Sequence, residues 1–254
     1  MTNILYSDLH RIIKGKVFTL GLALIFGYTF FVSLILKIVL VSVNADLSSD
    51  DVLTAFPTSA PFFIAASILF LFIGDFNDGT IRNKIMCGVK KNTVAASAIV
   101  LGGIISSVFV IFSQISGLVV AKIFTKGYES MTAVEIANFS LRNIIAAFAA
   151  GCFMAMILMV LGGTKIAYVA GLVVTFLFRV ATGEVADKLY PETGYCLLTG
   201  TKLQVYTLYD RYCPYAFFTG VNYHDLGKCL IGCIILSLIS LAIGMIVYEK
   251  REFK

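Results

Sequence analysis

Residues able to carry out chemistry are few in this sequence. Its only histidines, His10 and His224, flank the apolar stretches rather than interrupt them. No HExxH motif, no membrane glutamate pair and no serine within reach of a histidine can be assembled. The run GGTK at 162–165 lacks the earlier glycine and the strand of a phosphate-binding loop. The sequence therefore predicts a chain that is no enzyme by itself and holds no metal, cofactor or nucleotide.

The cysteines leave one question open. None of the six has the CxxC or Cys/His spacing of a zinc site. Cys196 and Cys213 fall in one connection on the predicted outer side, where oxidising conditions permit a disulfide closing a loop of about 17 residues. Two free thiols are the alternative.

The composition excludes a soluble protein. The 254 residues are 59% hydrophobic and 14% charged, with a mean hydropathy of +0.91, whereas globular chains are about half apolar and about a quarter charged. No basic run indicates a nucleic-acid partner. The elements that must position any functional residue are therefore membrane helices.

Six apolar stretches are long enough for spans, which need about 20 residues each. We expect one all-α transmembrane domain over residues 1–254 with spans at 17–41, 59–76, 94–121, 143–162, 166–183 and 229–248. Of the 20 basic residues, 11 fall at one set of loops and chain ends and seven at the other, with Lys37 and Arg179 inside spans. The positive-inside rule then predicts that both termini are cytoplasmic.

Polar and small residues inside the spans have ordinary structural explanations. Lys37 and Arg179 lie in the outer thirds of their spans, where snorkelling to the headgroups competes with a role in substrate binding. Gln114 is expected to form a hydrogen bond between helices. The small residues near Gly151 favour close helix packing; they are Ala146, Ala147, Ala149 and Ala150.

Residues 1–16 precede the first span and have one apolar side, formed by Ile4, Leu5, Leu9, Ile12 and Ile13. This pattern predicts a helix on the membrane surface with its apolar side at the headgroup boundary. A polar lead-in to the first span is the alternative.

A second short helix is predicted after span two, in the segment GDFNDGTIRNKIMCGVKKN at 74–92. Asp78 or Thr80 could cap its start, and Gly88 could end it. Its apolar side would be formed by Ile81, Ile85, Met86 and Val89. A solvated loop held by basic residues is the alternative.

The connection at about 182–228 is long and aromatic, with seven tyrosines. We expect one or two short helices that dip into the outer leaflet as re-entrant segments. Four of these tyrosines are candidates for an outer gate or substrate contact: Tyr206, Tyr209, Tyr212 and Tyr215. An interfacial aromatic belt is the alternative.

The segment after span two resembles the corresponding loop of ABC-2 type exporter permeases. That family has an acidic or amide residue before Gly-Thr, an apolar and a basic residue, and then a Gly-basic step. The matching residues here are Asp78, Gly79, Thr80, Ile81, Arg82, Lys84, Gly88, Lys90 and Lys91.

The resemblance implies a permease subunit in a bacterial plasma membrane, paired with a second permease, identical or different, and two cytoplasmic ATPases that bind ATP and Mg²⁺. The segment around Ile85 would be the coupling helix that docks in the ATPase. The short chain is most similar to permeases for export of, or immunity to, antimicrobial peptides, although a drug, lipid or ion is also open. The alternative function is a membrane scaffold or sensor that does not transport.

Overall fold

The computed structural model describes residues 2–42, 45–125, 127, 131–191, 196, 198–219 and 225–250. Within these ranges all regular structure is helical, which confirms the all-α class. The elements are α1 (Thr2–Ile13), α2 (Lys16–Ser42), α3 (Ser49–Asn77), α4 (Thr80–Met86), α5 (Lys91–Phe124), α6 (Ala133–Leu161), α7 (Lys165–Leu189), α8 (Gly200–Tyr212), the 3-10 helix η1 (Pro214–Phe218) and α9 (Leu226–Glu249).

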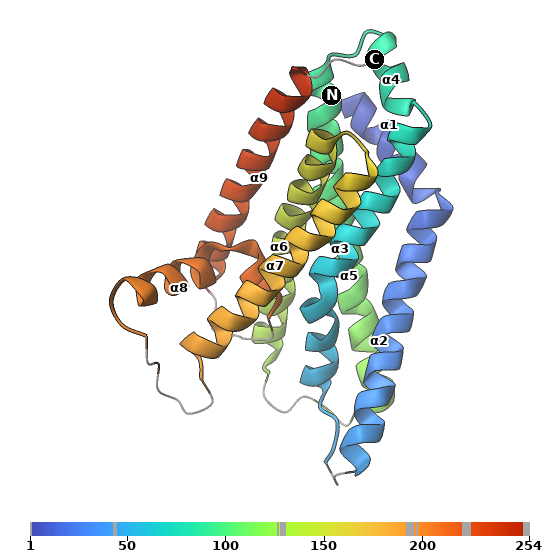
Figure 1. Cartoon of the computed structure of the whole chain (residues 1–254). Helices are drawn as coiled ribbons and strands as arrows, with labels where there is room; N and C mark the ends of the chain where they lie inside the picture. Colours follow the sequence, from blue (N-terminus) through green and yellow to red (C-terminus); the bar gives the residue numbers. More distant parts are fainter. Residues whose placement is uncertain are drawn as a thin grey trace.

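Six of these helices are long and apolar enough to cross a membrane: α2, α3, α5, α6, α7 and α9. Even α9, with 24 residues, extends about 36 Å at 1.5 Å per residue, which exceeds a hydrocarbon core of roughly 30 Å. The six predicted spans are confirmed, and they indicate a multi-pass membrane protein. Both chain ends lie at the same end of the bundle (Figure 1), here called the terminal end; the opposite one is the distal end.

Two spans begin about ten residues earlier than predicted, because polar residues cap them beyond the apolar stretch. α3 begins at Ser49, where the Ser48 hydroxyl accepts a hydrogen bond from the backbone N–H of Asp51 at 3.2 Å. α6 begins at Ala133, where Thr132 and Glu135 form a reciprocal capping box. Hydropathy locates the apolar part of a helix, whereas capping side chains decide where its hydrogen bonding starts.

Helices α5 and α6 form the centre of the bundle and touch through small residues. A Cβ on Gly151 would lie 2.4 Å from the carbonyl oxygen of Gly102, and one on Gly102 would lie 2.7 Å from the Cβ of Ala155. The predicted close approach at the small residues of α6 is confirmed. Because the two backbones are nearly in contact, only glycine fits at this crossing.

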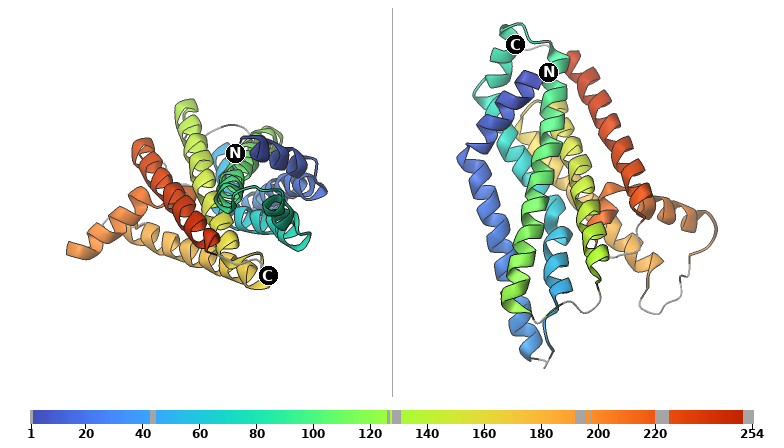
Figure 2. Two further views of the ribbon diagram at one scale, coloured as in Figure 1. Left: turned by 90° about the horizontal axis from the view of Figure 1, so that it is seen from above. Right: turned by 180° about the vertical axis from the view of Figure 1, so that it is seen from behind.

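The other spans surround this pair. α3 packs against both α5 and α6, α2 lies beside α3 and α5, α7 beside α3 and α6, and α9 beside α5 and α6 (Figures 1 and 2). α2, α7 and α9 are the least buried spans. They expose apolar side chains along most of their length, which suits contact with lipid or with a second membrane subunit.

α1 is a separate helix, and the bundle covers its apolar side. Leu5, Leu9 and Ile12 pack against the hydrophobic core, whereas Ile13 is exposed. α1 contacts α2 and α5. The predicted N-terminal helix is therefore confirmed, and three of its apolar side chains contact the bundle, whereas its position at the membrane surface stays a prediction.

Candidate functional site

The short helix predicted after span two is present as α4, but its start differs from the prediction. Its N-cap is Gly79, which has φ +66° and no side-chain hydrogen bond. Asp78 instead ends α3, where its backbone N–H donates to the carbonyl of Gly74. The predicted capping by Asp78 or Thr80 is wrong. The two-residue reversal between α3 and α4 needs a left-handed backbone conformation, which glycine adopts without strain.

The end of α4 follows the prediction. Gly88 has φ +87° just beyond the helix, and its N–H donates to the carbonyl of Ile85 at 3.0 Å. The N–H of Val89 donates to the carbonyl of Lys84 at 3.2 Å. These bonds satisfy the last carbonyls of a short helix.

One side of α4 is fixed to the bundle and the other is exposed. Ile81 is buried, and Ile85 and Val89 pack against the core. Met86, expected on this apolar side, is instead 68% exposed, and Arg82 is exposed too. α4 therefore presents a basic and an apolar side chain one turn apart.

A network of charges joins α4 to α1 and α3. The ammonium of Lys84 donates to both carboxylate oxygens of Asp8, each at 2.7 Å. Arg11 donates to Asp75 at 2.5 Å and lies 3.7 Å from Asp8. Both carboxylates are buried, and the hydrogen bond that Arg11 donates to Asp75 raises the pKa of Arg11. Because burial strengthens such contacts, the network holds three helix ends together.

Sequence reasoning missed this network. Asp8 was assigned no role from the sequence, and Lys84 was placed only in the segment that would dock in an ATPase. The only signal was the spacing of Asp8 and Arg11, three residues apart on one helix face. Lys84 and Asp75 are far from them in the chain, and only packing brings them close.

Together α1 and α4 form a surface at the terminal end, here called the terminal platform. α1 exposes Tyr6, His10 and Ile13 along one side, and the Tyr6 and His10 rings stack with centroids 6.2 Å apart. α4 adds Arg82 and Met86. Exposed apolar groups outside the spans are typical of protein-binding surfaces.

At the distal end, α8 projects sideways from the bundle beyond α7 and α9 (Figures 1 and 2). Three of the four candidate gate tyrosines are engaged with α7. Tyr209 donates to the carbonyl of Phe178 at 3.2 Å, and Tyr206 lies beside the exposed pair Glu184 and Lys188. Only Tyr212, 37% exposed, points outward.

Tyr215, the fourth candidate, lies inside the bundle. All five residues of η1 are buried, and η1 packs against α3, α6, α7 and α9. The ring of Tyr215 stacks on Phe178 with centroids 4.5 Å apart. The structure therefore does not bring the four tyrosines together on one surface.

Cys196 and Cys213 are free thiols in the structure. The exposed thiol of Cys196 donates to the carbonyl of Lys188, whereas Cys213 caps the end of α8 beside η1. The two side chains contact different elements, so of the two alternatives left open by the sequence the structure has the free thiols. Among the described residues, no three His, Cys, Asp or Glu side chains are grouped as a metal site would need.

Two of the polar residues in the spans link helices. Ser140 of α6 donates to Gln114 of α5 at 3.3 Å, which confirms the expected hydrogen bond. Lys37 of α2 donates to the carbonyl of Phe124 at the end of α5, with its ammonium 5.4 Å from that ring centroid. Arg142 lies just before the predicted span at 143–162, but it is buried inside α6 because that helix already begins at Ala133.

Comparison with known proteins identifies no relative: no protein-family model matches the chain, and no curated protein matches it significantly.

Proposed function

We propose that this chain is the membrane permease subunit of an ATP-driven exporter and that its terminal platform binds a separate cytoplasmic ATPase. The observation that carries the proposal is the structure of α4. Ile81 anchors this short helix in the core and Lys84 fastens it to α1, while Arg82 and Met86 stay exposed. A helix held in this way can be pushed as a rigid piece by a partner.

The charge network supports a role in transmitting movement. Asp8 contacts Lys84 of α4, and Arg11, one turn further along α1, contacts Asp75 near the end of α3. A displacement of α4 therefore acts on α1 and α3 together. α3 in turn packs against α2, α5, α6, α7 and η1, so movement at the platform has a contiguous route to the distal end.

The rest of the proposed assembly follows from the exposed surfaces and charges. The terminal end carries most of the loop Lys and Arg residues and would face the cytoplasm of a bacterial cell. A second permease, identical or different, would cover part of the exposed apolar spans. ATP and Mg²⁺ would be bound by the ATPase. The buried η1 would be a re-entrant segment, and α8 with Tyr212 would meet an amphipathic substrate, such as a peptide, as it leaves.

The test is partner capture at α4. We would place a photo-crosslinking amino acid at Met86, and at Leu208 of α8 as a control that is also exposed. In native membranes, Met86 should crosslink to a protein with ATPase motifs and Leu208 should not. Arg82→Glu should abolish the crosslink, whereas Lys202→Glu, which reverses an exposed charge at the distal end, should leave it unchanged.

Two results would count against the proposal. A crosslink at Met86 that captures no ATPase, or one that persists in the Arg82→Glu variant, would show that the terminal platform does not bind an ATPase. Capture of an ATPase whose activity no peptide, drug or lipid stimulates would instead support a scaffold or sensor that does not transport.

A further inference from the structure

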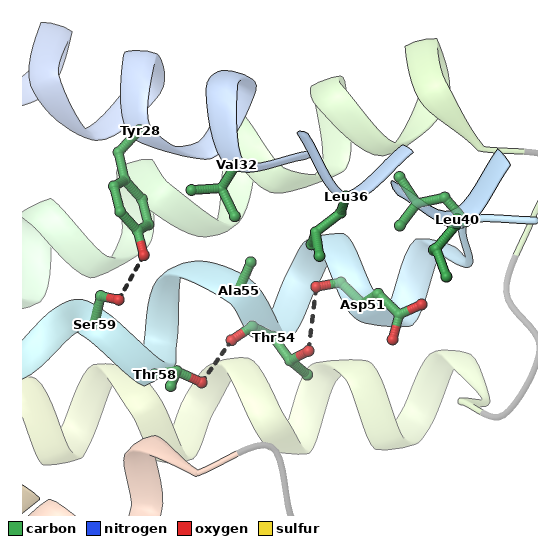
Figure 3. Close-up of a pocket in the computed structure, with 10 residues that line it drawn as sticks. Tyr28, Val32, Leu36, Leu40, Asp51, Thr54, Ala55, Thr58 and Ser59 are labelled. Atoms are coloured by element: carbon green, nitrogen blue, oxygen red, sulfur yellow. Dashed lines mark hydrogen bonds between the residues drawn. The ribbon is translucent and has the colours of Figure 1, made fainter. Parts of the chain in front are cut away.

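The seam between α2 and α3 contains two cavities, one nearer each end of the bundle. The cavity toward the distal end, here called the distal cavity, has a volume of about 400 Å³ and is shown in Figure 3. The cavity toward the terminal end, the proximal cavity, has about 320 Å³ and also includes Phe109 of α5. α2 forms one wall of both cavities and is one of the least buried spans.

The two walls of the distal cavity differ in chemistry. α2 contributes Val32, Leu36 and Leu40, which lie one helical turn apart and form a continuous apolar strip (Figure 3). α3 contributes polar side chains, described below. A cavity with one apolar and one polar wall fits a molecule that has a hydrocarbon chain and a polar head.

Two hydroxyls of the polar wall, those of Thr54 and Thr58, are oriented as acceptors. Thr54 donates to the carbonyl of Asp50 at 3.0 Å and lies 3.2 Å from the carbonyl oxygen of Asp51. Thr58 donates to the carbonyl of Thr54 at 3.0 Å (Figure 3). Since each hydroxyl has only one proton, both oxygens retain lone pairs but no donor. A ligand head beside these two threonines must therefore bring its own N–H or O–H donors.

Asp51 adds a negative charge at the distal edge of the same cavity. It is exposed, and its Oδ2 accepts a hydrogen bond from Ser48 at 2.7 Å. Within the described ranges no Lys, Arg or His forms an ion pair with it. A carboxylate beside an acceptor-rich wall selects a protonated amine over a neutral or anionic head.

Tyr28 closes the cavity toward the terminal end. Its hydroxyl shares a 2.6 Å hydrogen bond with Ser59, which ties α2 to α3 (Figure 3). Its ring packs edge-on against Phe63 at a centroid distance of 5.1 Å, and Phe63 lines the proximal cavity. Tyr28 and Phe63 therefore form the partition between the two cavities.

We propose that the distal cavity is a binding site for a membrane-dissolved amphiphile with a protonated amine head, and that Tyr28 is the gate to the proximal cavity. The amine binds Asp51 at the mouth, and the hydrocarbon chain lies along Leu36 and Val32. Along α3, the distance from Asp51 to Ser59 is about 12 Å at 1.5 Å per residue. This distance limits the length of hydrocarbon chain that fits between the carboxylate and the partition at Tyr28. Transport of this amphiphile rests on the proposed function, whereas its binding does not.

The test uses dodecylamine with a photoreactive diazirine near the end of its chain, and its neutral N-acetyl analogue as the matched ligand. The full chain is placed in phosphatidylcholine nanodiscs, irradiated and analysed by peptide mass spectrometry. The amine should label α2 around Tyr28 and Val32, and the neutral analogue should label it roughly tenfold less.

Three variants of the chain sharpen the result. Asp51→Asn keeps an acceptor for Ser48 and should reduce amine labelling roughly tenfold. Asp225→Asn, at the N-cap of α9, changes another acidic residue at the start of a distal-end span and should leave labelling unchanged. Tyr28→Ala should extend labelling to Leu24 and Leu20 in the proximal cavity.

Equal labelling by the amine and the neutral analogue would show that the cavity holds an acyl chain of the bilayer only, and would overturn the proposal. Unchanged labelling in Asp51→Asn would do the same. These outcomes are independent of ATPase capture at Met86, because the nanodiscs contain no ATPase. Failure of the amphiphile site and failure of the exporter proposal are therefore distinguishable.

Discussion

Replacing Lys84 by methionine removes the cation that faces Asp8 and keeps a side chain of similar length. The Lys84 side chain is 20% exposed and that of Asp8 8% exposed, and the ammonium contacts both carboxylate oxygens. Exposed ion pairs contribute about 0–1 kcal/mol, and breaking a buried pair costs about 3–5 kcal/mol. Since Arg11 remains 3.7 Å from Asp8, we expect a coupling of about 1–3 kcal/mol.

Hydrogen exchange of the α4 amides measures this coupling locally. α4 has only seven residues, too few for a helix that is stable alone, so its protection depends on its attachments. Loss of about 1–3 kcal/mol should increase exchange of these amides roughly 5- to 150-fold. Lys188→Met is the control, because it removes an exposed helical ion pair at the distal end and should not change exchange in α4.

A double-mutant cycle separates the pair from general disruption. Lys84→Met and Asp8→Asn are measured singly and together, and the double variant should cost about 1–3 kcal/mol less than the two single costs added. Single costs that add within about 0.5 kcal/mol would refute the reasoning. Unchanged exchange in α4 after Lys84→Met would refute it as well.

Other substitutions and labelling experiments test the packing and the distal end. Gly151→Ala should cost about 1–3 kcal/mol of unfolding free energy or more, because the new Cβ would lie against a facing carbonyl oxygen. Gly183→Ala meets open space inside α7 and should cost nothing in the same unfolding assay, with a gain of up to about 1 kcal/mol from helix propensity. Without reductant at neutral pH, a maleimide should label the exposed Cys196 quickly and Cys213 slowly. The rate at Cys213 should rise with pH, because burial raises the pKa of that thiol. Protection of both thiols until a reductant is added would show a disulfide instead. Tyr215→Phe should leave stability unchanged or raise it, because the buried hydroxyl has no hydrogen-bond partner among the described residues. Tyr215→Ala should cost about 3–5 kcal/mol. A large loss in the phenylalanine variant would show that the hydroxyl has a partner, such as Thr175.

The sequence by itself determined the number of spans, the small-residue face of α6 and the end of α4 at Gly88. Each of these depends on local properties of the chain. An apolar stretch of about 20 residues must be removed from water whatever its neighbours are. Small side chains permit close approach by any helix, and a glycine at positive φ ends a helix through its own backbone.

Only the tertiary structure decided which distant residues meet. It paired Asp8 with Lys84, placed Tyr215 inside the bundle and turned Met86 outward. It also opened the cavity between α2 and α3 that Tyr28 closes at one side. Hydropathy and helical spacing describe the environment that a residue prefers, but they do not specify its partner. Partners between helices far apart in the chain are set by how the side chains of all six spans pack together.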